Sequence, residues 1–173
     1  MTVSIRRAFR CWPRILTVTV AAKPCGRERI LALRFSGTCH ERELFDASPE
    51  AVVAGREASP TPLLALDRLY ELRLAPEGQV VFVVPPDRSW PAADNSGGVA
   101  RLTADIAGAY RISVNQGLWI DIVAKRRLIA SNDFQARADC QAPHKIEQYV
   151  LPGRQDFVLQ LSGGIAPRRY RYT

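Results

Sequence analysis

The chain lacks most of the sequence features by which enzymes are recognised. Its 173 residues include only two histidines. No G-x-S-x-G, G-x-x-x-x-G-K or G-x-G-x-x-G motif occurs, which argues against a serine hydrolase elbow, a P-loop and a dinucleotide-binding loop. No run approaches the ~20 apolar residues that cross a bilayer. We therefore expect no transmembrane segment, no catalytic residue and no cofactor.

Cysteine is scarce and is not arranged for metal binding. None of the four cysteines forms a C-x-x-C pair, so a zinc ribbon is not expected. In an oxidising compartment a disulfide Cys39–Cys140 or Cys25–Cys140 is a candidate. Free thiols fit the sequence equally well.

The positive charge is confined to the beginning of the chain. The net charge is +7, and residues 1–40 hold eight Lys or Arg against one Glu. The remaining residues hold sixteen basic and sixteen acidic side chains. Because the body of the protein has no basic excess, nucleic-acid binding is not expected there. Contact through the basic leader remains an alternative.

The leader has the order of an export signal. A basic segment "MTVSIRRAFRCWPR" precedes the short apolar stretch "ILTVTVAA", and Val20–Ala22 resembles a cleavage site. The pattern gives partial support to a periplasmic or secreted protein, an expectation that depends mostly on the resemblance described below. The alternatives for residues 1–40 are a disordered tail or a misread start.

A short helix is expected between the leader and the main domain. Ser48 is suited to cap a helix, Pro49 to its first position and Glu50 to its first turn, so we predict a helix over about 49–57. The prolines of "SPTP" end it. The predicted division is therefore a leader at 1–40, a helix and linker at 41–62, and a β domain at 63–173.

From residue 63 onward the pattern has the period of two that is typical of strands. Strands are expected at 69–74, 79–84 and 99–104, followed by "GAYRISV", "LWIDIV", "RRLIAS", "KIEQYVL" and "DFVLQLS". The segments 85–98 and 131–145 are predicted loops, where a binding site would lie. Short strands without helices between them predict an all-β protein, an antiparallel β-sandwich of the jelly-roll or Ig-like class with about seven or eight strands.

The segment 109–123 is interpreted as a hairpin. A turn at 115–117, with positive φ at Gly117, would place Arg111 opposite Asp121. This pairing would lower the pKa of Asp121 and oppose a general-acid role. The expected core face is Tyr110, Ile112, Val114, Leu118, Ile120 and Ile122.

Trp119 lies on the opposite face of this predicted hairpin. Either the protein covers it, through residues 49–57 or 85–98, or it offers a stacking platform to a sugar. His144 and Glu147 are three residues apart on a predicted strand and point to opposite faces, so they are not expected to share a metal ion.

Several motifs in order resemble a group of small, β-rich, exported bacterial proteins. The motifs are "AGAYRISVNQGLWIDIV", "NDFQARADCQAPHKIEQYVLP" and "DFVLQLSG", over roughly residues 60–165. The matching residues are Gly108, Tyr110, Arg111, Trp119, Asp121, Cys140, His144 and Lys145. Members often carry the name homogentisate 1,2-dioxygenase, yet this chain has none of that enzyme's cupin iron motifs.

Pattern and resemblance together predict a non-catalytic binding module of the periplasm or envelope, whose partner is a protein or a glycan. The candidate ligand-binding residues are Trp119, Arg111, Asp121, His144 and Lys145. The alternative that the resemblance implies is an iron-dependent, ring-cleaving dioxygenase. Iron would be a cofactor only in that case.

Overall fold

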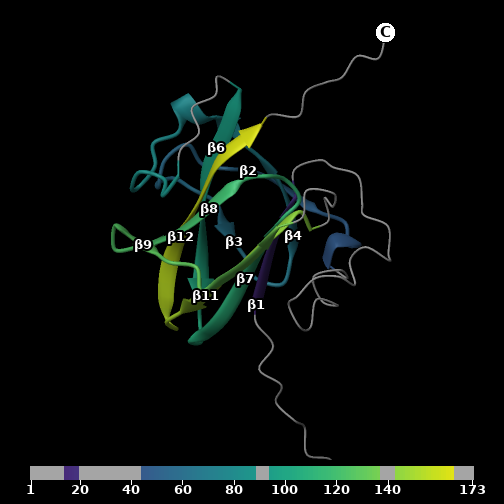
Figure 1. Cartoon of the computed structure of the whole chain (residues 1–173), viewed down its shortest axis with the longest axis vertical. Coiled ribbons are helices and arrows are strands. Elements are labelled where there is room, and N and C mark those ends of the chain that lie inside the picture. The colour runs from purple at the N-terminus through teal and green to yellow at the C-terminus, as the bar shows by residue number, and fades with distance from the viewer. Residues whose placement is uncertain (1–13, 20–43, 89–93, 137–142, 166–173) are drawn as a thin grey trace, which may run out of the picture.

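The protein is all-β, with its strands in two sheets (Figure 1). The computed structural model describes residues 14–19, 44–88, 94–136 and 143–165. Sheet A contains, in spatial order, β10 (Asp133–Ala136), β11 (Lys145–Leu151), β7 (Gly108–Val114), β1 (Arg14–Thr19), β4 (Leu69–Arg73) and β2 (Glu50–Val53). Sheet B contains β3 (Leu63–Leu64), β6 (Asn95–Ala104), β12 (Gln155–Ile165), β8 (Trp119–Ala124) and β9 (Arg127–Ile129), with β5 (Ala75–Pro76) also paired to β6.

The sequence led us to expect wholly antiparallel sheets, but both sheets contain parallel pairs. β10, β11 and β7 pair antiparallel, as do β6, β12, β8 and β9. β1 pairs parallel with both β7 and β4, β2 pairs parallel with β4, and β3 with β6. Parallel neighbours require long connections, and here each parallel pair joins segments well separated along the chain.

β1 comes from the apolar stretch that was predicted to belong to an export signal. Its residues Arg14–Val18 pair with Tyr110–Val114 of β7, and Thr17–Thr19 pair with Leu69–Glu71 of β4. β1 therefore lies in the interior of sheet A rather than in a tail, as Figure 1 shows beside β7.

The predicted helix at 49–57 is wrong. Glu50–Val53 forms β2, in register with Tyr70–Arg73 of β4. The capping signals around Ser48 are local and weak, whereas the adjacent valines suit a strand, and pairing with a neighbour overrides helix propensity.

The predicted strand at 79–84 is wrong as well. After the 3-10 turn η1 (Glu77–Gln79) the chain runs as a loop along sheet B. The backbone N–H groups of Val83 and Val84 donate to the side-chain carbonyl of Gln160 on β12, whose amide donates back to the Val84 carbonyl. The Gln160 side chain thus forms the backbone hydrogen bonds that a neighbouring strand would otherwise form with Val83 and Val84.

The largest correction concerns 109–123, which is not a hairpin. β7 belongs to sheet A and β8 to sheet B, so residues 115–118 carry the chain from one sheet to the other. Among the described glycines only Gly163 has a positive φ, so Gly117 does not make the predicted turn. The predicted core face is nonetheless confirmed, because all six of its residues are buried in one cluster with residues of both sheets.

Candidate functional site

A pocket opens where the edge strands β9 and β10 end the two sheets. Its volume is about 480 Å³. It is lined by Asp87, Arg88, Trp119, Ile120, Asp121, Leu128, Ile129, Ala130, Ser131, Phe134, Lys145, Glu147 and Tyr149. Both segments predicted as loops, 85–98 and 131–145, contribute residues to it, but Phe134 belongs to β10 and Lys145 to β11, so the prediction of a loop over all of 131–145 is wrong. The chain passes from β9 to β10 through Ala130 and Ser131 at the wall of this pocket.

The floor of the pocket is built by alternate residues of β11. Lys145, Glu147 and Tyr149 share one face of the strand, because successive side chains alternate between faces. The register places them beside the core residues Val114, Ile112 and Tyr110 of β7. Three polar side chains therefore point into the interior, where each requires a partner.

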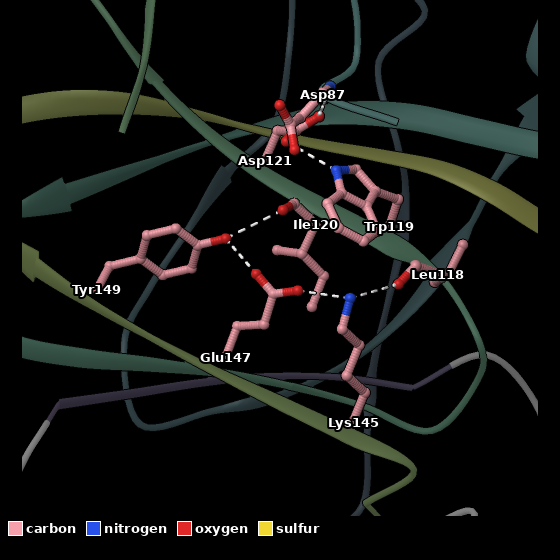
Figure 2. Close-up of polar contacts among 8 residues, drawn as sticks. All are labelled: Asp87, Leu118, Trp119, Ile120, Asp121, Lys145, Glu147 and Tyr149. Atoms are coloured by element: carbon pink, nitrogen blue, oxygen red, sulfur yellow. Dashed lines mark hydrogen bonds and ion pairs between the residues drawn. The ribbon is translucent and has the colours of Figure 1, made fainter. Parts of the chain in front are cut away.

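These three side chains satisfy one another and the backbone of β8 (Figure 2). Lys145 Nζ lies 2.5 Å from Glu147 Oε1 and donates to the Leu118 carbonyl at 3.3 Å. The Tyr149 hydroxyl lies within hydrogen-bond distance of both Glu147 Oε2 and the Ile120 carbonyl. The pairing of β9 with β8 reaches only to Ile122. Beyond that point, Lys145 and Tyr149 connect the edge of sheet B to sheet A.

Tyr149 has one hydroxyl proton for two acceptors. It can donate to the Glu147 carboxylate or to the Ile120 carbonyl, but not to both at once. Burial, and next the negative charge of Glu147, raise the pKa of Tyr149 above its ordinary value. The tyrosine therefore stays protonated and acts as a donor within the floor of the pocket.

Asp121 is held by two neutral donors and not by the predicted arginine. Trp119 Nε1 donates to Asp121 Oδ1 at 3.0 Å, and the Asp87 backbone N–H donates to Oδ2 at 3.3 Å. Arg111 is in the other sheet and donates from Nε to Gln148 Oε1 at 3.1 Å. The expected Arg111–Asp121 pair is therefore wrong, because it required β7 and β8 to be neighbours.

The pKa of Asp121 is shifted in the direction opposite to the prediction. Burial raises it above the ordinary value of 3.8, and this effect exceeds the lowering by the two hydrogen bonds. The negative charges of Asp87 and Glu147 raise it further. A proton, or another positive charge, at the Asp121 carboxyl group would therefore offset the cost of burying its negative charge.

Replacing Asp121 by asparagine is expected to change how stability depends on pH. Because the pKa of Asp121 is higher in the folded than in the unfolded protein, its ionised form opposes folding. The free energy of unfolding of the wild type therefore falls as the pH rises from 3.8 through the raised pKa. Urea midpoints measured from pH 3 to 8 should therefore shift in favour of Asp121→Asn with increasing pH.

The matched control for this measurement is Asp156→Asn, which removes an exposed carboxylate that accepts a hydrogen bond from Thr103. Its pH profile shows how much of the trend comes from removing a carboxylate at the surface. If the two variants had parallel pH profiles, Asp121 would not carry the raised pKa.

Trp119 is half-buried and covered by the protein. Arg88 lies over its ring at 5.2 Å from the centroid and Lys145 at 4.5 Å. Of the two segments that the sequence suggested as covers, the described part of 85–98 provides Arg88. Two cations at the ring leave Trp119 unsuited as an open stacking platform. The exposed aromatic ring of the pocket is Phe134, with 60% of its surface accessible.

The other predicted site residues lie elsewhere. Arg111 and Gln148 lie on the opposite face of sheet A from Glu147. His144 is half-buried, its backbone N–H donates to the Val114 carbonyl, and it does not line the pocket. Cys39 and Cys140 lie outside the described residues, so the predicted disulfide stays a prediction.

Glu147, Tyr149 and Phe134 are pocket residues that sequence reasoning missed. The signal for the first two was present, because "KIEQY" places Lys145, Glu147 and Tyr149 on one face of a strand. A polar face is ordinarily solvated, and nothing local indicates that this one points inward.

Within the described ranges, no group of three His, Cys, Asp or Glu residues could hold a metal ion. The helical segments of the described residues include none with the length and apolar character of a membrane span. Comparison with protein-family models, curated proteins and solved structures finds no match to this chain. The candidate site therefore depends on the geometry of the chain itself.

Proposed function

We propose that the protein is a non-catalytic binding module that takes one or two sugar units of a glycan in the pocket between β9 and β10. The observation that carries this proposal is that one pocket is lined both by buried polar groups and by an exposed aromatic ring. Asp121 and Glu147 lie in the interior of the pocket, and Phe134 lies at its exposed side.

The size and chemistry of the pocket suit a small polar ligand. Ligand pockets commonly enclose roughly 300–1,000 Å³, with a few polar groups that orient the ligand. A sugar has hydroxyl groups for carboxylates and an apolar ring face for an aromatic side chain. Phe134 and Leu128 supply exposed apolar surface, and Asp121 supplies acceptor oxygens.

The bonding of Glu147 supports binding rather than catalysis. One of its oxygens pairs with Lys145 and the other accepts from Tyr149. A general base must be free to take a proton from the substrate. Glu147 is instead bound to two side chains of its own strand, which makes it part of the floor.

The wider proposal places this module in the periplasm or outside the cell, as a β-sandwich of the jelly-roll or Ig-like class. The joint core of the two sheets supports the sandwich. The resemblance and the basic leader support export. β1 sets a condition on the export route, because cleavage after Ala22 would remove a strand from the interior of sheet A.

Calorimetric titration with a panel of neutral and charged mono- and disaccharides tests the proposed function. At least one sugar should bind, and Phe134→Ala should weaken its binding at least ~10-fold, because a buried ring contact is worth on the order of 1–3 kcal/mol. The exposed position of Phe134 means that folding should be little affected.

Val150→Ala is the matched control, since Val150 is 61% exposed and does not line the pocket. Its affinity should equal that of the wild type. The proposal fails if no sugar of the panel binds, or if the two variants bind equally well.

A further inference from the structure

We infer that the ligand carries a protonated amine that binds Asp121, so that the glycan recognised is an amino sugar with a free amino group. This inference rests on the proposed function and adds the chemical class of the ligand.

The first argument is the unequal treatment of the two carboxylates in the pocket interior. Glu147 has a cation, because Lys145 Nζ is 2.5 Å from it. Asp121 is only 5% exposed, yet within the described part of the chain its partners are two uncharged N–H groups. A buried carboxylate without a cation is costly to keep ionised, and a cation brought by a ligand would offset that cost.

The second argument is the balance of charge around the pocket. Its lining contains three carboxylates, those of Asp87, Asp121 and Glu147, and two cations, Arg88 and Lys145. Lys145 is matched by Glu147. The remaining charges leave the pocket with an excess of one negative charge, which favours a cationic over an anionic ligand.

The third argument is the behaviour of the protein's own cations at the same place. Both Arg88 and Lys145 lie over the ring of Trp119, which itself donates to Asp121 (Figure 2 shows the indole between Lys145 and Asp121). Aromatic faces attract cations, more strongly where water is excluded. Within the described residues neither of these cations forms an ion pair with Asp121, which lies at the N–H edge of the indole, so this carboxylate is left for a cation that a ligand brings.

The test compares four pyranoses of similar size by calorimetry at pH 6, using the full chain. D-Glucosamine carries the ammonium group, D-glucose replaces it by a hydroxyl, N-acetyl-D-glucosamine neutralises it, and D-glucuronate is an anion. We expect D-glucosamine to bind at least ten-fold more tightly than D-glucose. N-Acetyl-D-glucosamine should resemble D-glucose, and D-glucuronate should bind most weakly.

Variants assign the preference to Asp121. In Asp121→Asn the affinity for D-glucosamine should fall to that for D-glucose, whereas Asp156→Asn should keep the wild-type preference. Lowering the pH from 6 should weaken D-glucosamine binding to the wild type progressively, because protonation removes the charge of Asp121. The β-1,4-linked glucosamine dimer, added as a further ligand, distinguishes a site for a glycan chain from one for a free monosaccharide by its tighter binding.

The outcomes separate this inference from the proposed function. If D-glucose binds as tightly as D-glucosamine, or if Asp121→Asn keeps the preference, the amine inference is wrong while sugar binding stands. If none of these sugars binds, the amine inference is wrong, and the wider panel described above decides whether sugar binding stands.

Discussion

A chain that begins at Lys23 is expected to unfold at much lower urea concentrations than the full chain, if it folds at all. Its beginning corresponds to cleavage after Ala22, which removes β1. β1 pairs with five residues of β7 and three residues of β4, so each of these strands loses one of its two neighbours in the sheet. In a sheet of this kind, the backbone groups left facing the gap must find water or another strand.

The size of the effect follows from the number of bonds involved. A backbone hydrogen bond contributes roughly 0.5–1.5 kcal/mol net, so a six-residue strand between two neighbours contributes on the order of 5 kcal/mol. Domains are stable by only about 5–15 kcal/mol. The loss of β1 is therefore comparable to the whole stability of the protein.

A chain that begins at Arg14 is the matched control, because it also lacks the first basic residues but keeps β1. Urea midpoints of the three chains show whether the fold tolerates the loss of β1. Mass spectrometry of the mature N-terminus shows whether cleavage after Ala22 takes place. If the chain beginning at Lys23 were as stable as the control, β1 would not be a structural strand and cleavage at Ala22 would be compatible with the fold.

Replacing Lys145 by methionine is expected to destabilise the protein by about 3–5 kcal/mol, because it leaves the buried Glu147 without its cation. The side chains of this pair are only 10% and 6% exposed, so solvent does not compensate for the loss. The Leu118 carbonyl loses a donor as well. Urea denaturation at pH 7 measures the difference.

Two controls identify the buried charge as the cause. The double variant Lys145→Met with Glu147→Leu should recover much of the stability, since it removes both charges. Arg127→Met removes an exposed cation of β9 and should stay within about 0.5 kcal/mol of the wild type. A single Lys145→Met variant that costs less than about 1 kcal/mol would contradict the ion pair.

Alternation in the sequence predicted which apolar side chains between residues 110 and 122 join the core cluster. It did so even though the predicted pairing was wrong, because the face of a strand depends only on its own period of two. Tyr110, Ile112 and Val114 point inward from sheet A, and Ile120 and Ile122 from sheet B. A connection between two sheets and a hairpin leave the same alternation, so the local pattern could not distinguish them.

The pairing of strands is a property of distant segments, and this is where prediction failed. β1 and β2 find their partners more than ten residues away, in β4 and β7. Local signals at Ser48 and Pro49 indicated a helix instead. The apolar run 79–84 had the composition of a buried strand, but its backbone is satisfied by Gln160.

The candidate site was predicted only in part, because some of its contacts also depend on how distant strands pair. Trp119, Asp121 and Lys145 do line one pocket, but the partner assigned to Asp121 was wrong because it depended on pairing. Arg111 and His144 share the resemblance motif with these residues and lie outside the pocket. The inward direction of Glu147 and Tyr149 depends on β11 lying beside β7, which the sequence does not reveal.

The position of β1 has a consequence for the order of events during synthesis. The segment leaves the ribosome first, yet its partner β7 ends at Val114, 95 residues after Thr19. At roughly 5–20 residues per second, translation leaves the segment without that neighbour for roughly 5–20 s. If the protein is exported as proposed, translocation has to take place within this interval, before the sheet closes around the segment.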